Sequence, residues 1–372
     1  MAKDLARFAT ELLEKADITV NGDKPWDIQV HDPRLWGRVL KQGNLGLGEA
    51  YMDGWWDVPA LDQFIHKAVS ARLERQIQFT WSDLLLMAKS YLFNMQSTSR
   101  ASIVAEEHYD LDVEIYKSFL DPYNQYTCGY FKDTEDLNVA QEQKLDLICR
   151  KLGLKAGDRV LDIGCGWGGF AKFAAEKYGA HVVGITLSKE QLAYAKEFTK
   201  GLPVELRLQD YRDVREQFDH IVSVGMIEHV GYKNYREFMQ VAERCLKPDG
   251  LFLLHTIGYP ESIVAGDAWM SKYIFPNGLT PSIAQLASAA EKLFIIEDLH
   301  NFGAYYDKTL MAWFKNFDKS WSKLKEKYGE RFYRMWKYYL LSCAGVFRSR
   351  NLELWQIVLS KNGVPGGYTS IR

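Results

Sequence analysis

The feature that most constrains the fold is a regular alternation of short apolar strands and helical stretches. Strands rich in β-branched residues are expected over 159–163, 181–186, 204–209, 218–224 and 250–257. Helical stretches lie between them, and another over 138–152 precedes the first strand. Strands that alternate with helices pair in parallel, because each helix returns the chain to the same edge of the sheet. The sequence therefore predicts an α/β fold with a doubly wound, Rossmann-like sheet.

The C-terminal part of the chain is expected to close one edge of this sheet. Strands are predicted over 294–302 and 352–360, and two helical stretches, 307–328 and 330–348, lie between them. This order suits an antiparallel strand pair.

The N-terminal part has a different character. Residues 1–100 look mainly helical and irregular, with a turn-rich stretch over 43–57 and an apolar stretch over 83–95. A chain of 372 residues is long for one domain and comfortable for two. We expect a mainly helical N-terminal domain over 1–105, which docks on lipid or forms a dimer contact, and a catalytic domain over 106–372.

Charge and composition exclude several kinds of partner and site. The formal net charge of −2 gives no electrostatic footprint for nucleic acid. The five cysteines form no C-x-x-C pair, so neither a zinc site nor a disulfide framework is expected, and no metal is assigned. The N-terminus carries Asp4, Glu11 and Glu14 and lacks the apolar region of a signal peptide. We therefore expect a soluble, cytoplasmic protein.

The segment LDIGCGWGG (161–169), at the end of the first strand, predicts a nucleotide site. Gly164, Gly166 and Gly169 have the spacing that lets a backbone approach a ligand closely and enter a helix. A dinucleotide site also needs an acidic residue at the end of the second strand, to hold ribose hydroxyls. That strand ends GITLS, and Asp162 stands two residues before Gly164. Both departures disfavour NAD and favour S-adenosylmethionine, which has a sulfonium and a zwitterionic tail but no pyrophosphate.

Residues after the next strands complete the expected cofactor site. Asp210, in LQDYRD, would accept a hydrogen bond from the adenine amino group, and Tyr211 would offer an aromatic face beside it. Thr186 and Gln191 are expected to replace the missing ribose carboxylate.

Motifs spread over essentially the whole chain resemble those of bacterial cyclopropane-fatty-acyl-phospholipid synthases. Besides the glycine segment, they are HYD (108–110), DPYNQYTCGYF (121–131), SVGMIEHVG (223–231), LLHTIG (253–258), KYIFPNG (272–278) and NFGAYYDKTLMAW (301–313). The glycine segment alone would indicate only a methyltransferase. The combination of TCGYF, MIEHVG, LLHTIG and GAYYD is far more specific.

The resemblance implies addition of a methylene group from S-adenosylmethionine across a cis double bond of a phospholipid acyl chain, with bound bicarbonate as the base. The residues implied to surround that ion are Cys128, Glu228, His255, Ile257 (through its backbone) and Tyr306, and Asp307 is expected to orient the tyrosine. The cofactor is expected to contact Tyr126, Thr127, Asp162, Gly164, Gly166, Gly168, Thr186, Leu187, Gln191, Gln209, Asp210 and Tyr211. The expected partners are a bilayer with unsaturated acyl chains, contacted transiently at the inner face of the membrane, and a second copy in a homodimer.

This reaction needs alignment first and a base afterwards. An alkene has no proton to remove before it attacks a sulfonium, so alignment in a dry pocket does most of the work. The attack leaves a carbocation, which aromatic faces can stabilise and which loses a proton before the ring closes. Glu228 and His255 are expected at the ends of the fourth and fifth strands, on the ligand side of the sheet. We expect Glu228 to accept the bicarbonate hydroxyl proton, while His255 and Tyr306 donate to the ion.

Three other interpretations share parts of this pattern. An S-adenosylmethionine enzyme that leaves a simple methyl group on another lipid or small amphiphile would share the glycine segment without the bicarbonate set. An NAD-dependent oxidoreductase is disfavoured by GITLS, and a non-catalytic lipid-binding protein is disfavoured by the intact site motifs.

Overall fold

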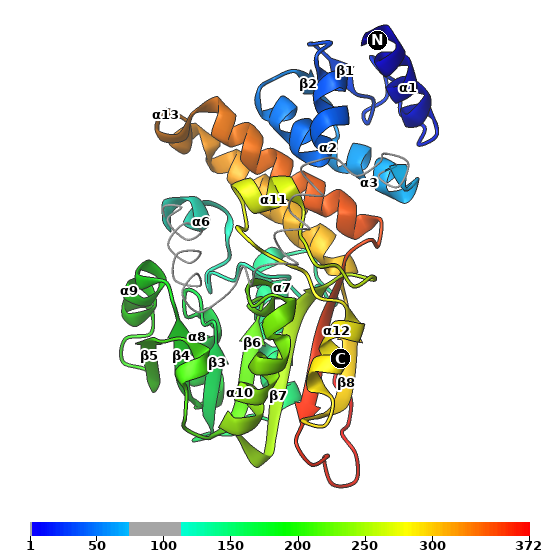
Figure 1. The fold of residues 1–372 in the computed structure, drawn as a ribbon. Coiled ribbons are helices and arrows are strands. Elements are labelled where there is room, and N and C mark those ends of the chain that lie inside the picture. The colour runs from blue at the N-terminus through cyan, green and yellow to red at the C-terminus, as the bar shows by residue number, and fades with distance from the viewer. Residues whose placement is uncertain (1, 74–112) are drawn as a thin grey trace. The chain divides into compact units, whose positions relative to one another are not determined.

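The computed structural model describes residues 2–73 and 113–372, which belong to two compact units (Figure 1). Among the described residues, the helical unit combines 2–73, 264–276 and 306–352, and the sheet unit combines 113–263, 277–305 and 353–372. The apolar stretch 83–95 and the HYD motif at 108–110 lie outside the described residues.

The sheet unit is built on seven strands in the order β5-β4-β3-β6-β7-β9-β8 (Figure 1). They are β3 (Arg159–Ile163), β4 (His181–Thr186), β5 (Val204–Leu208), β6 (Phe218–Val224), β7 (Leu246–Gly258), β8 (Ile295–Asn301) and β9 (Glu353–Ser360). Strands β3 to β7 pair in parallel, whereas β9 is antiparallel to both β7 and β8. The predicted doubly wound sheet and its antiparallel edge are therefore confirmed.

Residues that alternate along the central strands separate the two faces of this sheet. On one face, Val160, Val182, Val222, Leu253 and Val358 pack with α7 (Leu137–Leu152) and α8 (Gly169–Tyr178). On the other, the intervening strand residues pack with α10 (Tyr235–Cys245) and α12 (Ile283–Ala290). Because of this period of two, Asp162, His255 and Gln356 project toward the face that α7 covers.

The remaining elements that the structure describes in the sheet unit are short. They are the helices α6 (Val113–Phe119) and α9 (Lys189–Phe198) and the 3-10 turns η2 (Tyr211–Asp213), η3 (Ile227–His229) and η4 (Tyr232–Asn234). Turns η2 and η3 follow β5 and β6 directly, so they lie at the carboxyl ends of the strands, where ligands bind in folds of this kind.

The helical unit contains segments from both halves of the chain. Its described elements are α1 (Ala2–Glu14), β1 (Gln29–Val30), α2 (Leu35–Met52), β2 (Trp56–Asp57), α3 (Leu61–Ser70), α11 (Ala268–Tyr273) and most of α13 (Ala304–Arg348). The backbone leaves the helical conformation at Gly329 (φ 75°), where the two predicted helical stretches meet. The expectation of turns over 43–57 is wrong for most of that stretch, because α2 continues to Met52 after a break at Gly43.

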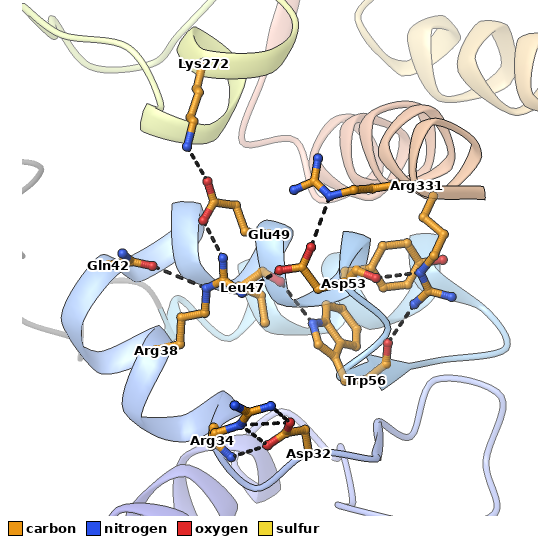
Figure 2. A network of polar contacts seen from close by, with 12 residues as sticks. Asp32, Arg34, Arg38, Gln42, Leu47, Glu49, Asp53, Trp56, Lys272 and Arg331 are labelled. Carbon is orange, nitrogen blue, oxygen red and sulfur yellow. Dashed lines mark hydrogen bonds and ion pairs between the residues drawn. The ribbon is translucent and has the colours of Figure 1, made fainter. Parts of the chain in front are cut away.

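A polar network ties α2 to α11 and α13 within the helical unit (Figure 2). The Glu49 carboxylate accepts hydrogen bonds from Arg38 Nη2 (2.5 Å), Lys272 Nζ (2.5 Å) and the Tyr273 hydroxyl (2.8 Å). Asp53 pairs with Arg38 (2.8 Å) and Arg331 (3.1 Å). The network explains why residues 264–276 and part of α13 group with the N-terminal segment.

The compact units do not follow a single boundary at residue 105. The chain passes from the sheet unit to the helical unit at residues 264 and 306, and it returns at 277 and 353. No helix among the described residues is long and apolar enough to cross a membrane. The roles assigned above to the two predicted domains stay predictions.

Candidate functional site

The glycine segment forms a tight turn between β3 and α8. Gly164, Gly166 and Gly168 have φ values of 84°, 53° and 84°, a left-handed region that favours glycine. Gly168 is the N-cap residue of α8, so the backbone N–H groups of the first helical turn begin there. A Cβ at Gly164 would lie 2.6 Å from Met226 Cγ, so a side chain there would collide with Met226, which follows β6 and precedes η3.

Asp162, the last residue but one of β3, is almost fully buried (2% exposed). Its Oδ2 atom is buried and has no hydrogen-bond partner among the described residues. Burial raises the pKa of Asp162 to about 7, and the charge of Lys144 opposes that rise. A buried carboxylate oxygen without a partner, beside a glycine turn, fits a ligand that brings a hydrogen-bond donor or a positive charge.

The residues at the end of β4 and just after it are hydrogen-bonded to one another. The Thr186 hydroxyl lies 3.1 Å from Gln191 Oε1 and accepts from Ser188 N (3.1 Å), and both Thr186 and Gln191 are buried. Leu187 lies between them, half-buried, and Gln209 N donates to the Thr186 carbonyl (3.1 Å). The structure thus brings four predicted cofactor contacts together at the ends of β4 and β5.

Asp210 and Tyr211 have local partners as well. The Asp210 carboxylate accepts from Arg212 N (2.9 Å), as the N-cap of η2, and from Arg212 Nη1 (2.9 Å). The Tyr211 ring is 5% exposed, packs against Phe238 (5.3 Å between centroids) and carries Arg212 on a face (4.7 Å). The ring is therefore part of the core, and Asp210 is the better placed of the two to meet a ligand.

The segment before α7 carries three predicted site residues. Tyr126 packs edge-on against Tyr116 and Phe119, at 5.2 and 5.9 Å between centroids. Thr127 accepts at its hydroxyl from Lys144 Nζ (2.8 Å) and at its carbonyl from Gln141 Nε2 (2.8 Å). Cys128 is fully buried, and its thiol donates to the Gly129 carbonyl (3.3 Å).

This segment approaches the end of β6. A Cβ at Gly225 would lie 2.8 Å from Thr127 Cγ2, and Gly225 N donates to the carbonyl of His255 (2.9 Å). Thr127 and the backbone of His255 therefore both contact Gly225, although they are far apart in the sequence.

Glu228 lies in η3, and its carboxylate faces the end of β7. Oε1 accepts from Ile257 N (2.8 Å), whereas Oε2 is buried and has no partner among the described residues. Burial raises the pKa of Glu228, although hydrogen bonds from the backbone and from Thr256 oppose this. The Ile257 N–H is thus bonded to Glu228, and its carbonyl accepts from the Thr256 hydroxyl (2.9 Å).

His255 is a buried, neutral imidazole with one free position. Its Nδ1 atom lies 3.3 Å from Gln356 Nε2, which can only donate, so the ring proton is on Nε2. That Nε2 atom is buried and has no partner among the described residues. Burial, together with the charges of Lys144 and Lys151, keeps the pKa of His255 well below its usual value. The ring can therefore donate a hydrogen bond from Nε2 to a ligand.

Tyr306 belongs to the helical unit, in the first turn of α13. Its ring lies 4.4 Å from that of Phe347 between centroids and is 7% exposed. The two oxygens of Asp307 accept from Arg348 at 2.8 and 2.9 Å, and its expected role in orienting the tyrosine stays a prediction. Arg348 also donates to Asp62 (2.6 Å), so Arg348 joins α13 to α3 within this unit.

Sequence reasoning missed Lys144, Gln141 and Gln356, which support the predicted residues. Gln356 shows no sequence signal, since it meets His255 only through the antiparallel pairing of β9 with β7. Lys144 could have been found, because it interrupts the apolar stripe of an amphipathic helix between Ala140, Leu145 and Ile148. Among the described residues, no group of three or more His, Cys, Asp or Glu side chains is arranged to hold a metal ion.

Comparisons with known proteins agree with this geometry. Residues 96–357 match the family model described as mycolic acid cyclopropane synthetase. The chain is 53% identical to the cyclopropane-fatty-acyl-phospholipid synthase of Escherichia coli strain K12 over 97% of this chain and 94% of that one. It is 39% identical to a probable fatty acid methyltransferase of Pseudomonas putida over 68% of each chain. Among solved structures, mycolic acid cyclopropane synthase CmaA1 complexed with SAH and CTAB is similar with a TM-score of 0.65 and 33% identity, over 70% of this chain and 98% of that one.

Proposed function

Because the chain belongs to the mycolic acid cyclopropane synthetase family, we propose that it transfers a methylene group from S-adenosylmethionine across a cis double bond of an unsaturated phospholipid acyl chain. The observation that carries this proposal is 53% identity to a cyclopropane-fatty-acyl-phospholipid synthase along nearly the whole chain. The sequence-based predictions of the family, the fold class and an S-adenosylmethionine-dependent enzyme are confirmed.

The residues at the ends of β3 to β5 fit S-adenosylmethionine. When bound, it supplies a methyl group activated by a sulfonium. The glycine turn leaves room for a ligand to lie close to the backbone. The buried Oδ2 of Asp162 offers a hydrogen-bond acceptor or a negative charge to the cationic part of S-adenosylmethionine. Asp210, Thr186 and Gln191 are the further side chains that we assign to its nucleoside part.

Bicarbonate as the base is supported by two orphaned atoms. Glu228 Oε2 is an acceptor and His255 Nε2–H is a donor, both buried and both without a partner among the described residues. A bicarbonate ion offers one O–H donor and several acceptor oxygens, so it can satisfy both. Bicarbonate would supply the base for the proton that the lipid cation must lose, and His255, whose pKa burial keeps well below its usual value, is a poor base that would hold the ion instead. Cys128 and Tyr306 are assigned to this set by the resemblance.

The proposed reaction is tested with vesicles of an unsaturated phospholipid and S-adenosylmethionine, followed by mass spectrometry of the acyl chains. A gain of one CH2 with loss of the alkene, shown by resistance to ozonolysis, is expected. The Pseudomonas putida relative favours a second candidate, a fatty acid methyltransferase. A product that keeps its alkene or carries only a methyl branch would support that candidate and contradict cyclopropanation.

The bicarbonate assignment is tested by Glu228→Gln. The amide oxygen can still accept from Ile257 N, but its NH2 cannot accept the bicarbonate proton, so turnover should fall at least about 100-fold even in saturating bicarbonate. Affinity for S-adenosylmethionine should stay within about twofold. Glu205→Gln, an exposed carboxylate on β5, is the matched control. Unchanged turnover of Glu228→Gln at saturating bicarbonate would refute the assignment.

Peripheral binding to the inner face of the membrane and a homodimer are the remaining parts of this proposal. The substrate supports the first, since its acyl chain lies within a bilayer. Flotation with anionic vesicles and light scattering after gel filtration test the two separately. A monomer that never floats would contradict both.

A further inference from the structure

Two buried lysines on α7 are outside every role assigned so far. Lys144 is fully buried, as is Lys151, two turns further along the same helix. Burying an ammonium ion is costly unless it is paired, so each should have a structural or functional reason. Their surroundings differ, and the difference points to a role for Lys144.

Lys144 binds the segment that carries Thr127 and Cys128. Its Nζ atom donates to Gln125 Oε1 (2.5 Å) and to the Thr127 hydroxyl (2.8 Å). Gln141, one turn earlier on the same face of α7, donates to the Thr127 carbonyl (2.8 Å). Thr127 is therefore held at both its hydroxyl and its carbonyl by one helix face.

The same segment packs directly on the cofactor turn. A Cβ at Gly169, the first residue of α8, would lie 1.9 Å from the carbonyl oxygen of Tyr123 and 2.2 Å from Gln125 Nε2. The segment thus contacts the start of α8 through Tyr123 and Gln125, and it contacts Gly225, just after β6, through Thr127. A shift of Gln125 or Thr127 would be passed to the glycine turn.

The charge of Lys144 also acts on the site. Burial lowers the pKa of Lys144 to about 8, and the nearby Asp121, Cys128 and Asp162 counteract that effect. In return, Lys144 is the group that opposes the raised pKa of Asp162. Asp121 is already bound by the backbone N–H groups of Tyr123 and Gln125 (both 2.8 Å), whereas Asp162 Oδ2 is without a partner among the described residues.

We propose that Lys144 is a positioning residue of the cofactor site: its ammonium fixes the Gln125–Thr127 segment against the glycine turn that would hold S-adenosylmethionine. This inference rests on the proposed function only through the cofactor. It does not depend on the lipid or on the base.

Lys151 supplies a matched control. Its Nζ atom lies 3.1 Å from His300 Nδ1 and 3.8 Å from Asp298 Oδ2, among residues that carry no site role. Asp298 keeps a second partner in Arg372 (2.6 Å), so Lys151→Met leaves that carboxylate paired. Lys151→Met therefore removes a buried cation from the same helix without touching the Gln125–Thr127 segment.

The experiment measures binding of S-adenosylhomocysteine to the full chain by calorimetry between pH 6 and pH 9, without lipid. Lys144→Met should weaken binding at least about tenfold at pH 7, where the wild-type Lys144 is still charged, relative to Lys151→Met. It should also move the pH of half-maximal affinity upward by at least about one pH unit, because Asp162 then loses the charge that favours its ionised form. Lys144→Arg keeps the charge but not the geometry, so it should lose affinity without that shift of the midpoint.

Equal affinities and equal pH midpoints for Lys144→Met and Lys151→Met would overturn the inference. Thermal unfolding of each variant shows that the comparison concerns folded protein. A wild-type chain that binds S-adenosylhomocysteine but does not cyclopropanate lipid would contradict the proposed reaction and leave this inference standing.

Discussion

At the scale of single residues, the candidate site is a set of buried polar atoms that lack partners. Asp162 Oδ2, Glu228 Oε2 and His255 Nε2 come from the ends of three parallel strands or the turns after them. Each such atom costs about 1–3 kcal/mol when unsatisfied, so a group of them at the carboxyl ends of the strands is where a ligand that bonds them is expected. Their position, rather than their residue type, marks the site.

Asp162→Asn should therefore separate stability from cofactor affinity. A carboxyl whose pKa is raised on folding, here to about 7, destabilises the folded state once the pH exceeds its unfolded pKa, and increasingly so up to about pH 7. The asparagine variant without cofactor should thus be more stable at pH 8, by roughly 1–2 kcal/mol. Its affinity for S-adenosylmethionine should fall about 10- to 100-fold, because a charge-assisted hydrogen bond is lost.

Chemical denaturation and calorimetry at pH 8 give the two quantities. Loss of both stability and affinity would assign Asp162 a merely structural role, and unchanged affinity would remove it from the cofactor site. At pH 5, where the wild-type carboxyl is protonated in the folded state, the two proteins should differ little in stability.

At the scale of elements, polar side chains rather than apolar packing alone join α2 to α11. Glu49 is 7% exposed and receives two cationic donors and one hydroxyl, and these partners lower its pKa to about 2 although burial opposes them. Its carboxylate is therefore a stabilising group as long as it is ionised.

Glu49→Gln should remove an acid-sensitive part of the stability of the helical unit. Because the pKa is depressed on folding, from 4.5 to about 2, this contribution is complete above about pH 5 and is lost as the pH falls toward 2. At pH 7 the variant should lose about 2 kcal/mol, since Lys272 and Arg38 lose their anionic partner. The difference from wild type should shrink as denaturation is measured at lower pH, and a difference that does not change with pH would contradict the assignment.

At the scale of the whole molecule, the chain builds its helical unit from three separate segments. Arg334 donates to the carbonyls of Tyr51 (2.6 Å) and Trp56 (3.0 Å), and Arg348 donates to Asp62 (2.6 Å). Both cations are on α13, and all their partners named here lie in the N-terminal segment. A boundary at residue 105 would cut these contacts.

A chain that begins at residue 106 is therefore expected not to fold into a stable catalytic domain. It would uncover Tyr338 on α13, whose ring packs against Tyr51 and Trp56 at 5.5 and 6.5 Å between centroids, and leave Arg334 without these acceptors. We expect aggregation, or dye binding and loss of near-ultraviolet circular dichroism, with S-adenosylhomocysteine binding reduced at least about tenfold. Removal of residues 1–15 alone, which hold α1, is the milder control. A soluble, cooperatively unfolding fragment with full affinity would show that the single boundary is adequate.

The sequence by itself determined the sheet and the kind of ligand. Strands such as 159–163, 181–186 and 218–224 were predictable to the residue, because apolar β-branched runs between glycine turns are a local signal. The glycine segment, Asp162 and the absent ribose acid identified the cofactor for the same reason, since each is read within a few residues.

Only the tertiary structure decided which of these residues meet, and what supports them. Ile257 N donates to Glu228, Gln356 Nε2 faces Nδ1 of His255, and Lys144 Nζ donates to the Thr127 hydroxyl. In the tertiary structure, α11 and most of α13 also belong to one compact unit with the N-terminal segment. None of these contacts joins neighbours in the sequence. They depend on strand order, register and helix packing, which arise from the burial of many side chains together and leave no local pattern to read.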